Sequence, residues 1–296
     1  MAQAPSAAGK SGNSVREDFP ERRAALSDKD FRKFAEFIHT ECGIKLPPAK
    51  KTMLEARLQK RLRILGLADF RSYTDQLFTG GGMERELIHL IDAVTTNTTD
   101  FFREPRHFEY LDDVVLPQWR AANPGREFRV WSAGCSLGME PYTLSMVLSE
   151  FASRFPDFRF SIMATDISTQ VLEKAARGIY TEDQVRAVPE TLKRKYFLRS
   201  KDRSRGLVRV APELRRTVNF RRLNFMEEFK VKEKMDVVFC RNVIIYFDKP
   251  TQESLLRRLT SCLQRGGHLF IGHSESLAGM ALPVHQAAPT IYRVGP

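Results

Sequence analysis

The spacing of apolar residues divides the chain into two regions with different expected structures. Between residues 27 and 94, apolar residues recur every three or four positions, which predicts amphipathic helices that share a small core. The residues before them are rich in Ala, Ser, Gly and Lys and show no such period. We therefore expect a disordered tail over residues 1–25, followed by an all-helical N-terminal domain over residues 26–95.

In the remainder of the chain, short apolar runs typical of strands alternate with amphipathic helical stretches. The runs at residues 127–131, 158–167 and 236–247 are apolar enough to be buried strands of one sheet. This alternation predicts an α/β domain with a doubly wound sheet over residues 121–296. A linker segment and a helix over residues 96–120 would join it to the helical domain.

A small antiparallel β insertion is expected within the α/β domain, at about residues 199–222. Two strand-like runs, at residues 206–210 and 217–220, lie there among many arginines. Because exposed strand edges accept extended peptides, this insertion is either a peptide-docking element or a solvated hairpin. A closing edge strand is expected at residues 290–294.

The sequence at residues 130–142 predicts a buried strand, a glycine-rich turn and a helix. Gly134 and Gly138 punctuate the turn, and Pro141 suits the first helical position. In doubly wound folds such a unit cradles a nucleotide, although the third glycine of the dinucleotide fingerprint is missing here. Taken alone, the pattern fits a tight turn that binds no ligand as well as it fits a nucleotide-binding turn.

The next apolar run ends in an acid, which favours nucleotide binding. Asp166 would lie at the carboxyl end of that strand, where a carboxylate can accept hydrogen bonds from both ribose hydroxyls. Ser168 and Gly178 are placed to begin and end the helix that follows. An isolated acid at a strand end is usually a helix cap, but together with the glycine turn it indicates ribose binding.

The chain has a net charge of +11 and an isoelectric point near 9.6, which indicates an acidic partner. Nucleic acid, an anionic membrane surface and an acidic protein all fit this charge. Part of the excess lies on the expected second helix, whose outer side carries basic residues against the single acid Glu55. That side is either a solvated face or a docking surface, and we favour docking. The candidate docking residues are Arg57, Lys60, Arg61 and Arg63.

Cysteine spacing and hydropathy indicate the cellular compartment of the protein and whether it has a metal site or a membrane span. The four cysteines lie far apart without a Cys-x-x-Cys pair, so neither a zinc site nor a disulfide framework is indicated. Unpaired thiols are typical of the reducing cytosol, and no apolar run approaches the length of a membrane span. We therefore expect a cytoplasmic protein that requires no metal and does not insert into a membrane.

Several segments, taken in order, resemble the CheR family, the S-adenosylmethionine-dependent methyltransferases that esterify glutamates on bacterial chemoreceptors. The segments are residues 97–104, 131–142, 164–167, 206–210 and 239–248. The resemblance covers roughly residues 27–295, including the helical domain and the β insertion that generic methyltransferases lack. It implies a class I methyltransferase fold, S-adenosylmethionine as cofactor and S-adenosylhomocysteine as its product.

The resemblance also implies roles for individual residues. Arg103 and Tyr246 would act at the methyl-transfer centre. Asp166 would hold the ribose of the cofactor, and Asn224 with Phe225 would lie at its adenine. The full set of implied cofactor contacts is Asn97, Thr99, Arg103, Gly134, Glu140, Asp166, Asn224, Phe225, Arg241 and Asn242.

Glutamate methylation is chemically compatible with these residue types. A glutamate carboxylate is already ionised at pH 7, so its attack on a sulfonium methyl group needs alignment and no general base. Arg103 would hold the incoming carboxylate, and Phe101, Phe102 and Tyr246 would wall the reacting centre. The implied substrate is the acidic helical cytoplasmic bundle of chemoreceptors. A receptor C-terminal tail peptide at the β insertion is a further candidate partner.

Two other classes of protein remain open. A signalling module that binds S-adenosylmethionine without turnover would share the cofactor residues, although intact Arg103 and Tyr246 argue against it. A nucleic-acid methyltransferase would explain the positive charge. Enzymes that methylate exocyclic amines often carry an Asn/Asp-Pro-Pro-aromatic motif, whereas the comparable strand end here reads Arg-Asn-Val-Ile at residues 241–244. We therefore expect a protein substrate and no nucleic acid.

Overall fold

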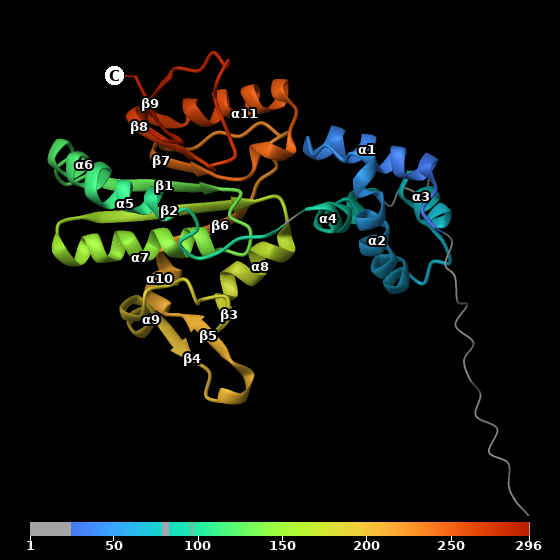
Figure 1. Cartoon of the computed structure of the whole chain (residues 1–296), viewed down its shortest axis with the longest axis horizontal. Coiled ribbons are helices and arrows are strands. Elements are labelled where there is room, and N and C mark those ends of the chain that lie inside the picture. Colours follow the sequence, from blue (N-terminus) through green and yellow to red (C-terminus); the bar gives the residue numbers. More distant parts are fainter. Residues whose placement is uncertain (1–24, 79–82, 96, 296) are drawn as a thin grey trace, which may run out of the picture.

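The computed structural model describes residues 25–78, 83–95 and 97–295, and Figure 1 shows their arrangement. The N-terminal part is helical, as the spacing of apolar residues predicts. Its elements are α1 (Asp28–Cys42), a 3-10 turn η1 (Pro48–Lys50), α2 (Lys51–Leu65), α3 (Phe70–Phe78) and α4 (Met83–Val94). The predicted N-terminal tail, apart from Ala25, lies outside the described residues.

Local sequence explains where α1 begins and ends. The Ser27 hydroxyl accepts a hydrogen bond from the N–H of Asp30 across 3.0 Å, which satisfies a donor that the helix itself leaves free. Gly43 ends the helix with a φ of 71°, a backbone conformation that glycine adopts without strain. The apolar faces of the four helices then meet in one core. Its fully buried members include Phe34, Leu54, Leu58, Leu62 and Tyr73.

A broken helix leads from the helical domain into the sheet. It consists of α5 (Arg106–Tyr110), a π-helical stretch η2 (Leu111–Val115) and α6 (Leu116–Ala122), each continuing into the next. Phe108, Leu111 and Val115 are buried on the side that faces the sheet. The helix predicted within residues 96–120 is therefore present, and its π-helical turn lies at its centre.

The C-terminal part folds around a seven-stranded sheet of order β6-β2-β1-β7-β8-β10-β9. Neighbouring strands from β6 to β8 pair in parallel, and β10 pairs antiparallel with both of its neighbours. The strands are β1 (Glu127–Ala133), β2 (Arg159–Asp166), β6 (Val218–Arg222), β7 (Met235–Cys240), β8 (Leu263–Ile271), β9 (Val284–Ala288) and β10 (Ile291–Val294). The helices among them are α7 (Met139–Arg154), α8 (Thr169–Arg177), α10 (Pro212–Thr217) and α11 (Lys249–Ser261).

Side-chain alternation along the central strand β7 explains why both faces of the sheet are covered. Val237 and Phe239 belong to the core that α7 completes, whereas Val238 and Cys240 belong to the core that α11 completes. All residues of β7 are buried, as expected for a parallel strand between two helical layers. Figure 1 shows α7 and α11 on opposite sides of the sheet. The predicted doubly wound α/β architecture is confirmed.

The β insertion differs from the prediction. A small antiparallel sheet of order β3-β5-β4 forms from β3 (Ile179–Thr181), β4 (Phe197–Arg199) and β5 (Leu207–Val210), with α9 (Glu190–Tyr196) between β3 and β4. The second run predicted for it, at residues 217–220, is instead part of β6, which pairs in parallel with β2. The boundaries of about 199–222 were therefore wrong, because a short strand with exposed arginines suits a hairpin and a sheet edge equally well.

The C-terminal edge of the main sheet also differs from the prediction. The strand predicted to close the sheet, β10, lies between β8 and β9, and β9 forms the edge. Strand β9 carries His285 and Gln286 in exposed positions and has no apolar run, so its sequence gives little sign of a strand.

Helix α7 begins at Met139, two residues before Pro141. Pro141 therefore lies in the first turn, where a residue without an N–H group costs the helix no hydrogen bond.

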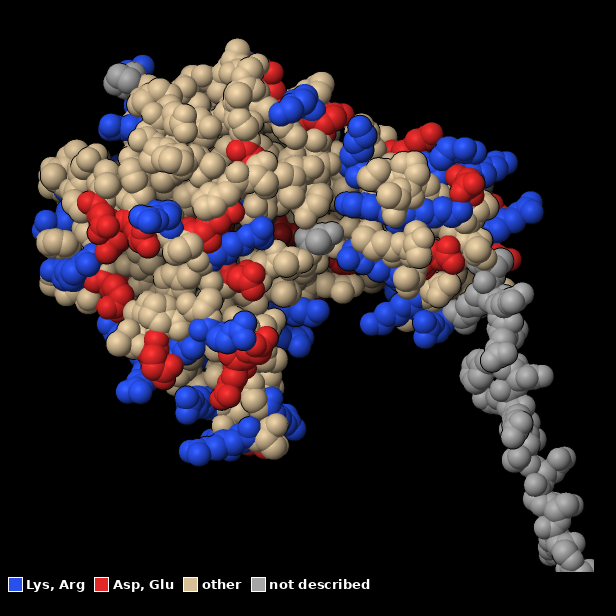
Figure 2. Space-filling view, viewed as in Figure 1, with Lys and Arg blue, Asp and Glu red and all other residues tan. Residues whose placement is uncertain are grey.

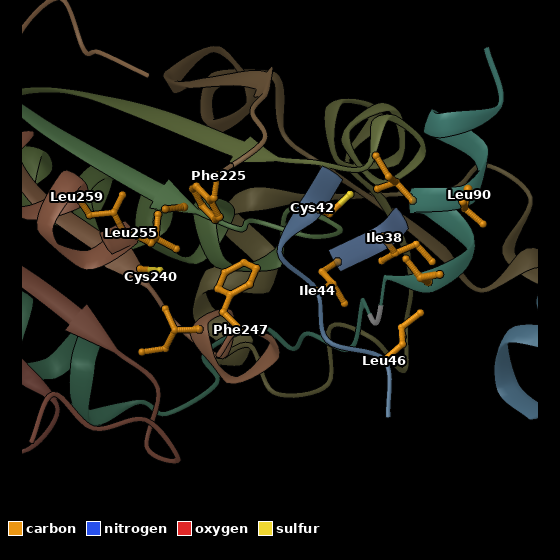
Figure 3. Close-up of a cluster of buried hydrophobic side chains, with 14 of the residues drawn as sticks. Ile38, Cys42, Ile44, Leu46, Leu90, Phe225, Cys240, Phe247, Leu255 and Leu259 are labelled. Atoms are coloured by element: carbon orange, nitrogen blue, oxygen red, sulfur yellow. The ribbon is translucent and has the colours of Figure 1, made fainter. Parts of the chain in front are cut away.

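The helical domain packs against the carboxyl end of the sheet through buried apolar residues. Figure 3 shows Cys42 and Ile44 from the end of α1 facing Phe225 and Phe247 of the α/β domain. A Cβ atom on Gly43 would lie 2.7 Å from Sδ of Met226, so the two parts approach as closely as a glycine allows. This contact brings the start of α2 to the edge where the parallel strands end.

The surface is strongly basic in two places. Figure 2 shows Lys and Arg side chains gathered over the helical domain and around the small sheet of β3, β4 and β5. Within the described part of the chain, no helix combines the length and the apolar character that crossing a membrane requires.

The helical core predicts unequal effects of two substitutions on α2. Leu58 is fully buried, so Leu58→Ala should lower the free energy of unfolding by about 2–5 kcal/mol. Ile64 on the same helix is 64% exposed, so Ile64→Ala should change it by less than about 0.5 kcal/mol. Urea denaturation followed by circular dichroism measures both. Equal effects would contradict the assigned core.

Candidate active site

A cavity of about 330 Å³ lies where the carboxyl ends of β1, β2 and β7 face the helical domain. Cys42, Ile44 and Lys50 contribute to its wall from the helical side. The structure also brings together there all the residues predicted for catalysis and cofactor binding, although their individual roles stay predictions. These residues are Asn97, Thr99, Arg103, Gly134, Glu140, Asp166, Asn224, Phe225, Arg241, Asn242 and Tyr246.

The glycine turn after β1 forms one wall of the cavity. Gly134 has a φ of +87°, and a Cβ atom there would lie 2.4 Å from Cγ2 of Val243. The N–H groups of Gly134 and Cys135 both donate to the Thr165 carbonyl (2.8 Å each), which fixes the turn against the end of β2. The position therefore requires glycine both for its backbone conformation and for space.

Asp166 ends β2 and binds the same turn. Its carboxylate accepts hydrogen bonds from the N–H of Ser136 (2.8 Å) and the N–H of Ser168 (3.0 Å). Burial raises the pKa of Asp166, and these N–H groups oppose that effect. Each carboxylate oxygen has a further lone pair, so the group can also accept hydrogen bonds from ligand hydroxyls.

Arg241, at the end of β7, joins three segments of the site. Its side chain is only 2% exposed, and its guanidinium pairs with Glu104 (3.2 Å) and Glu140 (3.3 Å) while donating to the Arg103 carbonyl. It also lies over the Phe108 ring, 5.4 Å from the centroid. The Ser132 hydroxyl donates to the second oxygen of Glu140 across 2.6 Å. Arg241 and Glu140 thus bind each other and shape the cavity wall.

Left-handed backbone at non-glycine residues concentrates around this cavity. Phe102, Glu104, Ser136 and Asn242 have φ values of 53°, 58°, 49° and 58°. Such conformations cost on the order of 1–3 kcal/mol each and persist where the surrounding structure holds them in place. Strain of this kind gathers at functional sites, which agrees with the position of the cavity.

Glu275 holds the loop after β7 and was missed from the sequence. Its carboxylate accepts hydrogen bonds from the N–H groups of Asn242 (2.9 Å), Ile244 (3.0 Å) and Gly272 (2.7 Å). Burial raises its pKa, although these donors act in the opposite direction. The only sequence signal was its place just after a strand end, which many surface acids share. It determines the position of the loop that carries Arg241 and Asn242.

Family models match almost the whole of the described chain. The all-alpha domain of CheR methyltransferases matches residues 29–95, and the S-adenosylmethionine-binding domain of these enzymes matches residues 97–292. The chain belongs to the CheR methyltransferase family. Its helical domain, its mixed seven-stranded sheet and its small antiparallel sheet form a class I methyltransferase-like fold.

Curated relatives align with this CheR family member over most of their length. A chemotaxis protein methyltransferase of Salmonella typhimurium is 40% identical over 272 residues, which cover 92% of each chain. One of Escherichia coli is 40% identical over 271 residues, covering 91% of this chain and 92% of the relative. One of Borreliella burgdorferi is 38% identical over 259 residues, covering 86% and 90%. The similarity therefore includes both the helical domain and the sheet.

The cavity of this CheR family member fits S-adenosylmethionine in its acceptors and its space. The Asp166 carboxylate has lone pairs that ribose hydroxyls could use, and Gly134 keeps the turn free of a side chain. Asn224 has a structural task as well, because its Nδ2 donates to the Glu41 carbonyl (2.7 Å) and its Oδ1 accepts from the N–H of Met226 (3.0 Å). Its proposed place at the adenine therefore depends on how the helical domain is docked.

Two of the aromatic residues predicted to wall the reacting centre lie elsewhere. Phe101 is 1% exposed and packs edge-on against Tyr180, with ring centroids 5.0 Å apart. Phe102 packs against Phe108, with centroids 5.7 Å apart, and neither ring lines the cavity. That part of the prediction was wrong, because adjacent residues in the strained segment point away from the cavity. Tyr246 does line it, together with Phe247.

The four candidate docking residues on α2 have different environments. Arg57 donates to the carbonyls of Ala93 (3.0 Å) and Thr95 (2.9 Å), and Arg61 forms an ion pair of 2.5 Å with Glu86. These two arginines therefore hold α2 against α4 and the segment after it. Lys60 and Arg63 are exposed. A docking role for all four stays a prediction, with Lys60 and Arg63 best placed for it.

Gly134→Ala should weaken binding of S-adenosylhomocysteine because the added Cβ displaces Val243 at the cavity wall. We expect a dissociation constant at least about tenfold higher, equivalent to about 1.4 kcal/mol. Gly125 also has a positive φ (+73°) but no atom within 4 Å of an added Cβ, so Gly125→Ala is the matched control for backbone strain. Isothermal titration calorimetry measures both, and equal loss of affinity in the two variants would contradict the account.

Proposed function

We propose that this CheR family enzyme transfers the methyl group of S-adenosylmethionine to glutamate side chains of chemoreceptors, forming methyl esters. The observation that carries the proposal is the convergence of distant segments on one cavity at the carboxyl edge of the sheet. That edge is where ligands bind in open α/β sheets. The family match over both domains supports the same reaction.

The proposed reaction needs positioning more than acid–base chemistry. S-adenosylmethionine, when bound, supplies a methyl group on a positively charged sulfur. A substrate glutamate with an ordinary pKa of about 4.3 is ionised at pH 7, so no residue has to remove a proton. The tasks of this chain are to orient the carboxylate, to exclude water and to hold the reacting groups in line.

Arg103 is the proposed carboxylate-binding residue. Arg241 is already neutralised by Glu104 and Glu140, whereas Arg103 forms no ion pair within the described part of the chain. Its guanidinium donates to the Thr98 carbonyl across 3.3 Å and lines the cavity, with donors left for a planar carboxylate. Tyr246 lies on the helical side, where Lys50 stacks over its ring at 5.4 Å. We propose that the substrate glutamate enters between these residues.

The basic surfaces suit an acidic helical substrate. Lys60 and Arg63 are exposed on α2, and Figure 2 shows the helical domain to be rich in Lys and Arg. We propose that this surface docks the cytoplasmic bundle of a chemoreceptor. The small sheet offers a second proposed contact, for a receptor C-terminal tail peptide, since Leu198 on its strand β4 is 53% exposed. Both proposed contacts require the enzyme to be in the cytoplasm.

Arg103→Ala should lower the kcat of methyl transfer to a receptor fragment at least about 100-fold, because the carboxylate loses its alignment. Transfer of radiolabel from S-adenosylmethionine measures the rate. Arg106 is the matched control. Its side chain is 86% exposed and, among the residues that the structure describes, forms an ion pair with Glu109 alone, so Arg106→Ala should retain wild-type activity.

The same assay separates catalysis from a signalling role. A wild-type chain that binds S-adenosylmethionine but labels no receptor in a competent panel would contradict the enzyme and favour a cofactor-sensing module. An Arg103→Ala variant with full activity would remove Arg103 from the reacting centre while leaving the reaction itself in place.

Charge reversal on α2 should act on docking and not on chemistry. Lys60→Glu combined with Arg63→Glu should raise the KM for a receptor fragment about tenfold at low salt and weaken its salt dependence, with kcat unchanged. The control is Lys232→Glu with Lys234→Glu, which makes the same charge change at exposed positions before β7. Steady-state kinetics at several salt concentrations give both constants. Equal KM values for the two double variants would rule out α2 as the docking surface.

A further inference from the structure

Three potential metal ligands lie together beside the cavity. Glu104, His107 and His273 each offer one ligand atom, and these atoms all lie within 4.8 Å of one another. Glu104 precedes α5, His107 lies within it, and His273 follows β8, so the fold joins them from two distant segments. We propose that this group binds Zn²⁺ and that the bound ion inhibits methyl transfer.

The surroundings of the His107 ring are the first observation that points to a cation. Its Nε2 lies 2.8 Å from the Thr290 hydroxyl oxygen, and that hydroxyl lies 2.7 Å from the Pro289 carbonyl, to which it can donate its one proton. With the hydroxyl proton on Pro289, Nε2–H of His107 donates to the Thr290 oxygen, and Nδ1 of a neutral ring carries a lone pair.

That lone pair faces a carboxylate. Nδ1 of His107 lies 3.5 Å from Oε2 of Glu104 and has no hydrogen-bond partner among the described residues. The His107 side chain is 1% exposed, so bulk water has little access to this atom. Two acceptors that face each other in a buried place are unfavourable, and a cation between them would satisfy both. This geometry suits two ligands of one metal ion.

His273 supplies the third ligand from the solvent side. Its Nε2 lies 3.9 Å from the same Oε2 of Glu104, and its side chain is 56% exposed, so the ring has room to turn toward an ion. Zn²⁺ binds imidazole nitrogen and carboxylate oxygen at about 2.0–2.2 Å, which places neighbouring ligands of a tetrahedral site about 3.4 Å apart. The Glu104–His107 separation of 3.5 Å is close to this value, the Glu104–His273 separation is 3.9 Å, and the third separation is within 4.8 Å. A water molecule would take the fourth position.

Arg241 explains why the ion would inhibit. Its Nη2 lies 3.2 Å from Oε2 of Glu104, so the guanidinium and a zinc ion compete for one carboxylate. This competition makes the site weaker than a structural zinc site. When it is filled, Glu104 moves toward the ion and Arg241 loses one of its two carboxylate partners. The segment that carries Arg103 is then held less firmly. This inhibition rests on the proposed function, whereas zinc binding does not.

Zinc binding is tested on the full chain by competition with a chromophoric chelator, for wild type, His273→Ala and His285→Ala. His285 is an exposed histidine of β9 outside the cluster and serves as the control. The four cysteines are all buried, which limits competing thiol sites. We expect wild type and His285→Ala to bind one ion, and His273→Ala to bind it at least about tenfold more weakly. No binding by wild type, or equal affinity in all three proteins, would overturn the site.

Inhibition is tested by adding Zn²⁺ to the methyl-transfer assay. We expect the wild-type rate to fall and to recover when a chelator is added. His273→Ala should show the wild-type rate without zinc and should resist inhibition, since its side chain is not part of the reacting centre. Zinc that binds through His273 without changing the rate would overturn the inhibitory role. A zinc-free wild type with no methyl transfer would contradict the proposed function and leave the binding result standing.

Discussion

The site depends on one buried ion-pair network, formed by Arg241 with Glu104 and Glu140. A guanidinium that is 2% exposed requires charged partners, because an isolated buried charge is strongly destabilising. Each partner belongs to a different segment, and the Arg103 carbonyl accepts a further hydrogen bond from the same group. One side chain thus fixes the end of β7 and the start of α7 relative to the strained segment that carries Arg103.

The helical domain completes the cavity that this network shapes. The N–H of Lys45 donates to the Tyr246 carbonyl (3.0 Å), and Nδ2 of Asn224 donates to the Glu41 carbonyl (2.7 Å). Gly43 allows the close approach between them. Tyr246 and Asn224, two of the proposed site residues, are therefore placed partly by the first domain. Docking of a substrate on α2 would affect the same contact between the two domains, since Lys50 at the start of α2 lies over the Tyr246 ring.

Local rules were sufficient to predict much of this architecture from the sequence. The four N-terminal helices follow from apolar spacing, and the turn at Gly134 follows from a strand, two glycines and a helix. That Asn97, Asn224 and Arg241 share one cavity came from the family resemblance, because no local pattern connects such distant segments. The resemblance thus predicted contacts between distant segments, which the spacing of apolar residues cannot predict.

The failures have physical causes that are particular to each element. Strand β6 is short and carries exposed arginines, so its partner could not be inferred from its composition. Phe101 and Phe102 were assigned to the cavity, but the Phe101 ring packs against Tyr180 and the Phe102 ring packs against Phe108. Glu275 was missed because its function is to accept backbone N–H groups that only the folded loop brings together. Contacts that exist only after folding leave no local signature.

The central claim is that this cavity methylates glutamate carboxylates of a receptor. The most direct test is mass spectrometry of a receptor cytoplasmic fragment after incubation with the wild-type chain and S-adenosylmethionine. The account predicts one added methylene per modified site, located on glutamate side chains and removed by mild base, as expected for an ester. Methyl groups on amine side chains that resist base, or no modification of a receptor that a known enzyme of the family labels, would contradict it.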